Sequence, residues 1–249
     1  MTPPIVFLTD FGLQDGYVGT MKGVIHAISP DTPIIDLSHD IPPQQVSAAA
    51  FVLWNSYKYF PSGSIFVSVV DPGVGSDREI WVLQTQDHVF IAPNNGLLDW
   101  VMAETSVRQL FKLENPKLMR SDISHTFHGR DIFSPAAAHI ARGFPLTQVG
   151  PLINYQLPQD PWIESGNRAK VVYIDHFGNA ITQLKQSTQP PTFIQIGKQT
   201  IPFHTTYASV AAGQPLALWG SHGLLEIAVR NGDAANQLGI SVGNEVSWT

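Results

Sequence analysis

The sequence of 249 residues contains no cysteine, and only 14% of its side chains are charged. The lack of cysteine excludes disulfide bonds and thiolate zinc sites, and it fits a reducing compartment, so we expect a cytoplasmic protein. No apolar run approaches the roughly 18 residues of a membrane span, and the N-terminus lacks the pattern of a signal peptide. The net charge of −6 argues against general nucleic-acid binding, which needs a basic surface. Neither a membrane nor a nucleic acid is therefore an expected partner.

The first part of the chain alternates between short apolar runs and segments with helical spacing. A hydrophobic content of 43% is enough for a sizeable core, and such alternation is typical of layered α/β domains. We therefore predict an α/β domain over residues 1–160. The expected strands are Ile5–Leu8, Ile34–Leu37, Ile65–Val70, Ile80–Gln84 and Val89–Ala92, and the expected helices are Gly16–Ile28, Val46–Trp54, Asn95–Val101 and Ile132–Ala141.

The pattern then changes, and residues 161–167 are predicted to be a linker because proline and glycine interrupt a stretch with little periodicity. Short strand-like runs separated by Gly, Pro and Asn follow, without a helix of normal length. These runs predict a small, all-β C-terminal domain of barrel or sandwich type over residues 168–249. The expected strands are Val171–Ile174, Ala180–Leu184, Thr192–Ile196, Pro215–Trp219, Leu224–Val229 and Glu245–Trp248.

Two separate segments carry the polar residues of greatest chemical interest. Asp71 directly follows the strand-like run 65–70 and begins a turn rich in Pro and Gly that ends at Arg78, and His128 lies in a second polar segment. Side chains at the ends of such strands are where α/β folds place reactive groups. The residues also have a structural interpretation, in which Asp71 closes a turn, Arg78 pairs with it and His128 is a core residue.

Other polar turns have similar double interpretations. Asp10 follows the first strand and is well placed to meet a ligand, whereas Asp15 could equally cap the next helix. Residues 175–179 form a good β-turn sequence, but their aromatic and amide groups could also recognise a purine. The three-residue spacing of His125, His128 and Asp131 would allow a metal site, which we disfavour because Gly and Pro crowd the segment.

Five segments, residues 9–12, 71–78, 92–96, 126–131 and 175–179, together resemble the S-adenosylmethionine hydroxide adenosyltransferases, relatives of fluorinating and chlorinating enzymes that act on the same compound. The resemblance runs over essentially the whole chain. It implies that Asp71, Arg78 and His128 orient and activate a water molecule. It also implies contacts to the substrate from Asp10, Asp15, Asp175, Phe177, Asn179, Tyr207, Ser221, Glu226 and Val229.

The implied activity is hydrolysis of S-adenosyl-L-methionine (SAM) to adenosine and L-methionine, with water attacking the ribose 5′ carbon and with no metal or other cofactor. The implied assembly is a homotrimer whose site lies between subunits. Two alternatives remain. A halogenase is disfavoured by Asp71, which would repel a halide, and by Gly129, where the fluorinating relative has a serine. A protein that binds adenosine or SAM without turnover would use the same binding residues.

Overall fold

The computed structural model describes residues 2–156, 160–163 and 166–248. The chain divides into two compact units, residues 1–159 and residues 160–249. The expected linker, residues 161–167, includes residues 164 and 165, which lie outside the described residues. The fold class agrees with the sequence prediction, because the first unit is a layered α/β domain and the second is an antiparallel β-domain.

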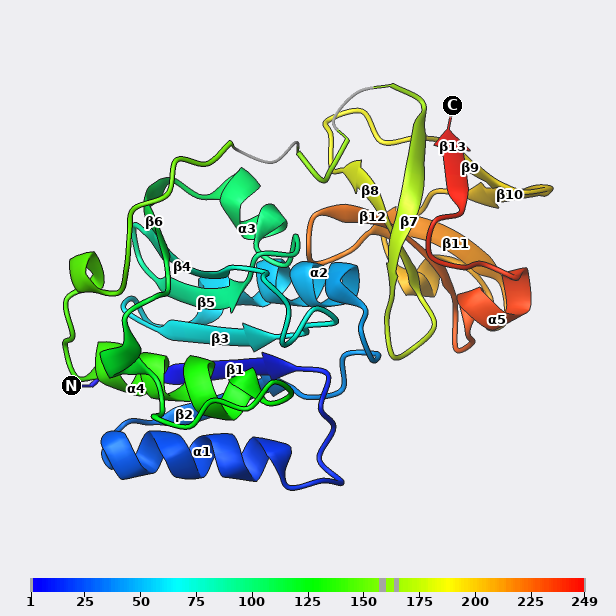
Figure 1. Ribbon diagram of the computed structural model, residues 1–249. Helices are drawn as coiled ribbons and strands as arrows, with labels where there is room; N and C mark the ends of the chain where they lie inside the picture. The colour runs from blue at the N-terminus through cyan, green and yellow to red at the C-terminus, as the bar shows by residue number, and fades with distance from the viewer. Residues whose placement is uncertain (1, 157–159, 164–165, 249) are drawn as a thin grey trace. The chain divides into compact units, whose positions relative to one another are not determined.

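The strands of the first unit form one sheet in the order β2-β1-β3-β5-β4-β6 (Figure 1). Strand β1 pairs in parallel with both β2 and β3, β3 pairs in parallel with β5, and β4 runs antiparallel between β5 and β6. Every residue of β1 and β3 is buried, as expected for parallel strands that are covered on both faces. The strands are β1 (Ile5–Thr9), β2 (Ile34–Ser38), β3 (Ile65–Val69), β4 (Ile80–Thr85), β5 (Val89–Pro93) and β6 (Val107–Lys112).

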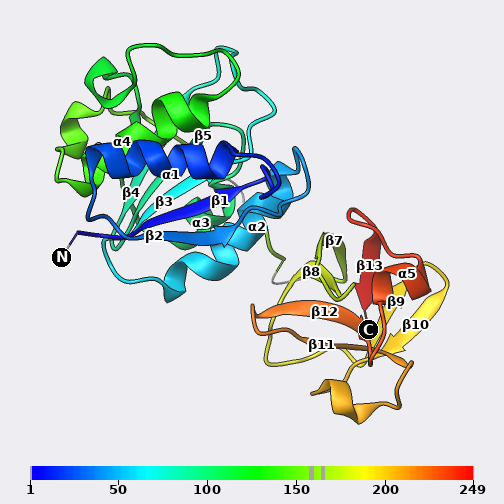
Figure 2. The ribbon, with the colours of Figure 1, turned by 90° about the horizontal axis from the view of Figure 1, so that it is seen from below.

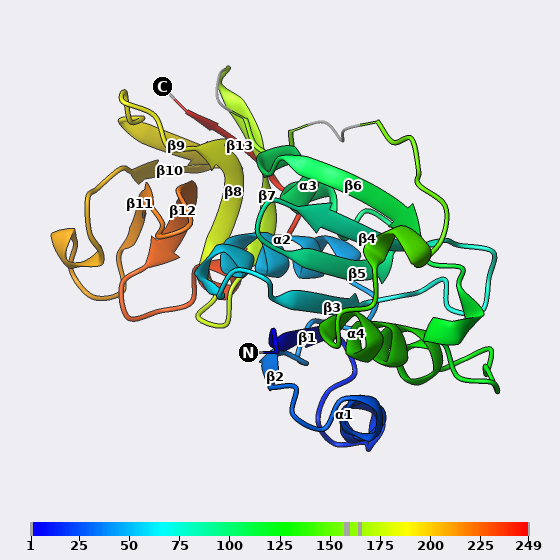
Figure 3. The ribbon, with the colours of Figure 1, turned by 90° about the vertical axis from the view of Figure 1, so that its left-hand side faces the viewer.

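Helices cover both faces of this sheet, with α1 and α4 together on one side and α2 and α3 on the other (Figure 3). Apolar side chains of α1 and α4 pack with those of β1 and β3 into the main core, which includes Phe7, Met21, Val67 and Phe133. The helices are α1 (Tyr17–Ile28), α2 (Val46–Ser56), α3 (Asp99–Glu104) and α4 (Ser134–Ala141), with short helical turns η1 (Tyr57–Tyr59), η2 (Pro116–Leu118), η3 (Gly129–Phe133, a π-helix) and η4 (Leu146–Gln148).

The structure differs from the sequence prediction at two places in this unit. The helix expected from Asn95 begins only at Asp99, because Gly96 adopts a φ of 94° that no helix accommodates. The side chain of Asn95 instead donates to the backbone oxygen of Val70 and accepts from the backbone of Leu97. Strand β6 was not predicted. No helix in the described part of the chain is long and apolar enough to cross a membrane.

The second unit is a sheet of seven strands in the order β10-β9-β13-β7-β8-β12-β11, which curls around an apolar core (Figure 2). Its two edge strands come together where Phe203 bridges to Ala217, so the sheet is nearly a closed barrel. Strand β10 and the short α5 were not predicted. The elements are β7 (Arg168–Ile174), β8 (Ala180–Lys185), β9 (Phe193–Ile196), β10 (Gln199–Pro202), η5 (Tyr207–Ser209), β11 (Pro215–Trp219), β12 (Leu224–Val229), α5 (Ala234–Leu238) and β13 (Glu245–Trp248).

Candidate active site

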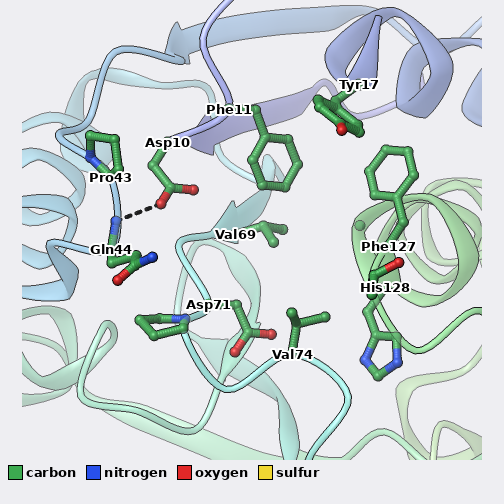
Figure 4. A pocket seen from close by; sticks show the side chains of 13 residues that line it. Asp10, Phe11, Tyr17, Pro43, Gln44, Val69, Asp71, Val74, Phe127 and His128 are labelled. Atoms are coloured by element: carbon green, nitrogen blue, oxygen red, sulfur yellow. Dashed lines mark hydrogen bonds between the residues drawn. The ribbon is translucent and has the colours of Figure 1, made fainter. Parts of the chain in front are cut away.

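A cavity of about 400 Å³ lies at the carboxyl ends of β1 and β3 (Figure 4). These strands are parallel neighbours, with Thr9 opposite Val69, so the segments that follow them emerge at the same edge of the sheet. Asp10 follows β1, and Asp71 follows β3 two residues after its end. The topology therefore brings two carboxylates that are 61 positions apart in the sequence to the wall of one cavity. The lining residues are Asp10, Phe11, Tyr17, Pro43, Gln44, Val69, Asp71, Pro72, Val74, Thr126, Phe127, His128 and Gly129.

Asp71, Arg78 and His128 form one connected cluster. The guanidinium of Arg78 donates to Oδ2 of Asp71 from Nε at 2.8 Å, and its Nη2 lies 2.6 Å from the same oxygen. The same Nη2 lies 2.7 Å from Nδ1 of His128. The side chains of Asp71 and Arg78 are only 4% and 11% exposed, so this charge pair is largely shielded from water. The structure thus brings together the three residues that the sequence singled out.

The hydrogen bonds fix the protonation of this cluster. Arginine always donates, so Nδ1 of His128 must accept, and the imidazole is neutral with its hydrogen on Nε2. Burial, reinforced by the neighbouring Arg78 guanidinium, lowers the pKa of His128 below its ordinary value. Among the described residues, Oδ1 of Asp71 has no hydrogen-bond partner although it is buried. The cluster therefore offers a carboxylate oxygen that can accept a hydrogen bond.

The loops that carry the cluster are held by close backbone contacts. Gly75 has a φ of 80°, and a Cβ at this position would lie 2.3 Å from the backbone oxygen of His125, so only glycine fits. Asp131 is fully buried and accepts from the backbone and hydroxyl of Ser124 and twice from Arg130. Although burial alone would raise its pKa, these hydrogen bonds lower the pKa of Asp131 to about 2.

The carboxylate of Asp10 is fixed by a residue that sequence reasoning missed. Gln44 donates its backbone N–H to Oδ2 of Asp10 at 2.7 Å, and it adopts a φ of 66°, which is uncommon outside glycine (Figure 4). A signal was available, because Pro42 and Pro43 immediately precede it and mark an irregular turn. Asp15 is exposed and is absent from the cavity wall; Gly16, without a side-chain hydrogen bond, is the N-cap of α1.

A second cavity, of about 680 Å³, lies in the β-domain and gathers four of the predicted residues, Phe177, Asn179, Tyr207 and Val229. Asp175 does not line this cavity but binds two residues that do. Its Oδ1 accepts from the backbone of Phe177 and Asn179, and its Oδ2 accepts from the side-chain amide of Asn179 at 3.0 Å. With its NH₂ group engaged in this way, Asn179 keeps its side-chain oxygen as an acceptor. The other lining residues are Ala208, Arg230, Asn231 and Gly232, which sequence reasoning missed although Asn-Gly is a turn signal.

Glu226 and Ser221 do not line either of these cavities. Glu226 is 5% exposed, accepts a short hydrogen bond from the hydroxyl of Tyr207, and lies 3.5 Å from Nε2 of His222. Burial and the Glu226 carboxylate raise the pKa of Tyr207, so its hydroxyl remains a donor. Ser221 is exposed in the turn before β12, at the opposite end of that strand from Val229.

The geometry of this segment also bears on the metal site that the spacing of His125, His128 and Asp131 would allow. In the segment from His125 to Asp131, the carboxylate of Asp131 faces Ser124 and Arg130, and Nδ1 of His128 faces Arg78. No group of three or more His, Cys, Asp or Glu side chains suited to a metal ion occurs in the part of the chain that the structure describes.

Fold and site together define a two-domain enzyme class, with a buried carboxylate–guanidinium–imidazole cluster at the end of a parallel sheet and an aromatic and amide pocket in an antiparallel β-domain. The SAM hydroxide adenosyltransferase N-terminal domain matches residues 5–150, and the C-terminal domain of the same family matches residues 169–247. The chain belongs to the SAM hydroxide adenosyltransferase family, as the sequence motifs predicted.

Individual relatives agree with this assignment. The chain is 37% identical to an (R)-S-adenosyl-L-methionine hydrolase of Thermus thermophilus, over 98% of each chain, and 37% identical to one of Salinispora tropica, over 100% of this chain and 98% of the relative. A crystal structure of an uncharacterised protein from Thermotoga maritima superposes with a TM-score of 0.88 at 35% identity, covering 98% of this chain and 100% of the other. A fluorinase of an Actinoplanes species is more distant, at 26% identity over 99% of this chain and 97% of the relative.

Proposed function

We propose that the protein hydrolyses S-adenosyl-L-methionine to adenosine and L-methionine. The observation that carries this proposal is the buried Asp71–Arg78–His128 cluster, which has a free carboxylate oxygen and shares its cavity wall with Asp10. The names of the relatives at 37% identity support the same activity. Their names specify an (R) form of SAM. Because the prefix L already gives the configuration of the methionine α-carbon, (R) refers to the sulfonium sulfur. We therefore extend the proposal to the epimer with the (R) configuration at sulfur.

In the proposed reaction a water molecule donates a hydrogen bond to Oδ1 of Asp71 and attacks the ribose 5′ carbon. The new bond joins oxygen to this carbon, and the electrons of the broken carbon–sulfur bond remain on sulfur as a neutral thioether. Asp71 takes the proton and later releases it to solvent. Arg78 keeps Asp71 in position, while the Nε2–H of neutral His128 can hydrogen-bond the attacking oxygen. Because the substrate carries a net charge of about +1 and both products are neutral, each turnover releases one proton.

The remaining predicted residues divide into direct and indirect roles. We propose that Asp10 binds the ribose diol, since a carboxylate presents two acceptor oxygens. In the β-domain we propose that Phe177 and Tyr207 stack on adenine and that Asn179 reads its edge, with Val229 as part of the same wall. Positioning roles suit Asp175, which orients Asn179, and Glu226, which anchors Tyr207. The contacts of Asp15 and Ser221 with the substrate stay predictions.

The halogenase alternative is weaker. A halide would have to enter a cavity in which Asp71 presents a buried oxygen without a hydrogen-bond donor, and this oxygen would repel an anion. The fluorinase relative is also less similar, at 26% identity. A binding protein without turnover would need no such cluster.

We further propose, from the family resemblance, a closed homotrimer that shares its substrate site between subunits and acts in the cytoplasm. Light scattering that gives a monomer mass at active concentrations would contradict this assembly.

The function is tested by incubating the purified protein with each sulfonium epimer of SAM and identifying the products by mass. We expect equal amounts of adenosine and methionine from the (R) epimer, with one proton released per adenosine in a pH-stat. Free adenine, or a 5′-chloro nucleoside formed when chloride is present, would contradict the proposal. An absence of turnover with tight binding would favour the binding-protein alternative.

A further inference from the structure

Three aromatic rings form one side of the cavity that contains the cluster. Phe11, Tyr17 and Phe127 contact one another edge to face, with ring centroids 6.0 Å apart for Phe11–Tyr17, 6.1 Å for Phe11–Phe127 and 5.2 Å for Tyr17–Phe127. We call these three residues the aromatic wall. The three rings, shown in Figure 4, also line another cavity of about 400 Å³.

Core packing accounts for two of these rings, because Phe11 and Phe127 are partly buried and pack against the main core, but it does not account for the third. Tyr17 is 49% exposed in the first turn of α1, where a polar residue would serve the helix equally well. The backbone at the other two residues is held by hydrogen bonds: the N–H of Phe11 donates to the hydroxyl of Thr9, and the N–H of Phe127 donates to the hydroxyl of Ser124. The backbone that carries the rings of Phe11 and Phe127 into the cavity wall is therefore held in place.

Gly129 allows the wall to close. A Cβ at this position would lie 3.0 Å from the sulfur of Met21 and 3.4 Å from ring atoms of both Phe11 and Phe127. Because glycine has no Cβ, the rings can approach the segment that carries His128. Among the described residues, Arg130 is the only cation that contacts a ring of the aromatic wall. Its guanidinium lies 5.2 Å from the centre of the Phe127 ring. Its charge is already balanced by a two-point ion pair with Asp131.

The charge of the substrate changes during the proposed reaction, and aromatic faces respond to that change. The sulfonium carries a fixed positive charge, and electron-rich ring faces attract cations. Cleavage leaves sulfur as a neutral thioether. In Figure 4 the rings of Phe11 and Tyr17 lie across the cavity from Asp71, which is the side that an in-line displacement assigns to the leaving group.

We propose that the aromatic wall of Phe11, Tyr17 and Phe127 recognises the positive charge of the sulfonium and so distinguishes substrate from the thioether product. This inference rests on the proposed function. Because the attraction is strongest before the carbon–sulfur bond breaks, the wall stabilises bound substrate more than the transition state. Its loss should therefore weaken substrate binding and raise kcat slightly rather than lower it, and it should not weaken binding of methionine.

The test uses two ligands that cannot react in this way, measured by calorimetry on the full chain. S-adenosylhomocysteine has a neutral sulfur, whereas sinefungin carries a protonated amine at the corresponding position. The variants are Tyr17→Leu and Phe127→Leu, which keep an apolar side chain but remove the ring. Tyr17→Phe is the matched control, since it keeps the ring and loses only the hydroxyl. Tyr17 is half exposed, so its replacement leaves the core intact even if Phe127→Leu reduces folding.

We expect the parent and Tyr17→Phe to prefer sinefungin over S-adenosylhomocysteine, and each leucine variant to lose about three- to ten-fold of that preference. A parent protein without this preference would overturn the inference, as would leucine variants that weaken both ligands by the same factor. The product assay separates the two proposals. If the parent forms adenosine but the preference does not depend on the rings, only the wall is wrong. If the preference depends on the rings but no adenosine forms, only the hydrolytic function is wrong.

Discussion

The two cavities that hold predicted site residues are built from different chemistry. The cavity of the α/β domain holds charged groups that are buried and paired, with Asp71 4% and Arg78 11% exposed. The pocket of the β-domain holds aromatic and amide groups near the surface, with Phe177 71% and Tyr207 45% exposed. Buried charge suits a reaction, because it is preorganised where charge develops. Exposed rings and directed amides suit recognition of a planar ligand. The contrast predicts that the charged cluster in the first cavity governs turnover and that the pocket of the β-domain governs affinity for adenosine.

The largest effect should come from the charged cavity. Asp71→Asn has the same shape but cannot take up a proton, so we expect kcat to fall by about 1,000-fold while Kd for adenosine changes little. Rapid-mix product analysis gives kcat, and calorimetry gives Kd. Asp77→Asn, in the same loop but not on the cavity wall, is the matched control and should retain full activity. A kcat for Asp71→Asn within a few-fold of the parent would remove Asp71 from the chemistry.

The next effect concerns the buried support of the same cavity. Asp131→Asn leaves Ser124 and Arg130 with a weaker acceptor, and we expect it to lower the free energy of unfolding by about 2 kcal/mol at pH 7. The folded-state pKa of about 2 lies below the ordinary value, so this stabilisation is present above about pH 4 and lost as pH falls toward 2. Urea titrations at pH 7 and pH 2.5 measure it, with exposed Asp122→Asn as control. An equal difference between parent and Asp131→Asn at both pH values would be evidence against this account.

The recognition pocket should show the reverse pattern to Asp71. Removing the amide in Asn179→Ala should raise Kd for adenosine by about 10-fold, with kcat at saturating substrate within a few-fold of the parent. Phe177→Ala should act in the same direction through lost stacking. Phe193→Ala removes another exposed ring of this domain that lies outside the pocket, and should leave Kd unchanged. A kcat that falls as much as affinity weakens would erase the proposed division between the cavities.

The smallest effect separates a direct from an indirect role for Glu226. Glu226→Gln keeps an acceptor for the hydroxyl of Tyr207 and should change Kd for adenosine by less than about two-fold, whereas Glu226→Ala should weaken binding by about three- to five-fold. Tyr207→Phe should make the alanine substitution nearly silent, because the residues would act as one unit. If Glu226→Ala weakened binding equally in the Tyr207→Phe background, Glu226 would contact the ligand itself.

Much of the catalytic cavity could be predicted from local sequence. Apolar runs ending at Asp10 and Asp71 predict parallel strands, and parallel neighbours place their carboxyl ends together. What could not be predicted depends on three-dimensional contacts. The hydrogen bond from the backbone of Gln44 to Asp10 joins two segments that come together only after folding. The start of α3 at Asp99 follows from a left-handed Gly96 that local propensity does not reveal.

The β-domain was harder to interpret in detail. The turn at residues 175–179 was recognisable, but the fact that Asp175 holds the amide of Asn179 comes from the folded turn. The burial of Glu226 beneath Tyr207 depends on the packing of η5 against β12, which no sequence period encodes.

The central claim is that water attacks the ribose 5′ carbon in the cavity of Asp71, Arg78 and His128. The most direct measurement is a reaction with SAM in heavy-oxygen water, followed by mass spectrometry of both products. We predict one heavy oxygen in the 5′ hydroxyl of adenosine and none in methionine, with the label formed about 1,000-fold more slowly by Asp71→Asn. Unlabelled adenosine, or adenine released with the label on the ribose 1′ carbon, would contradict the account.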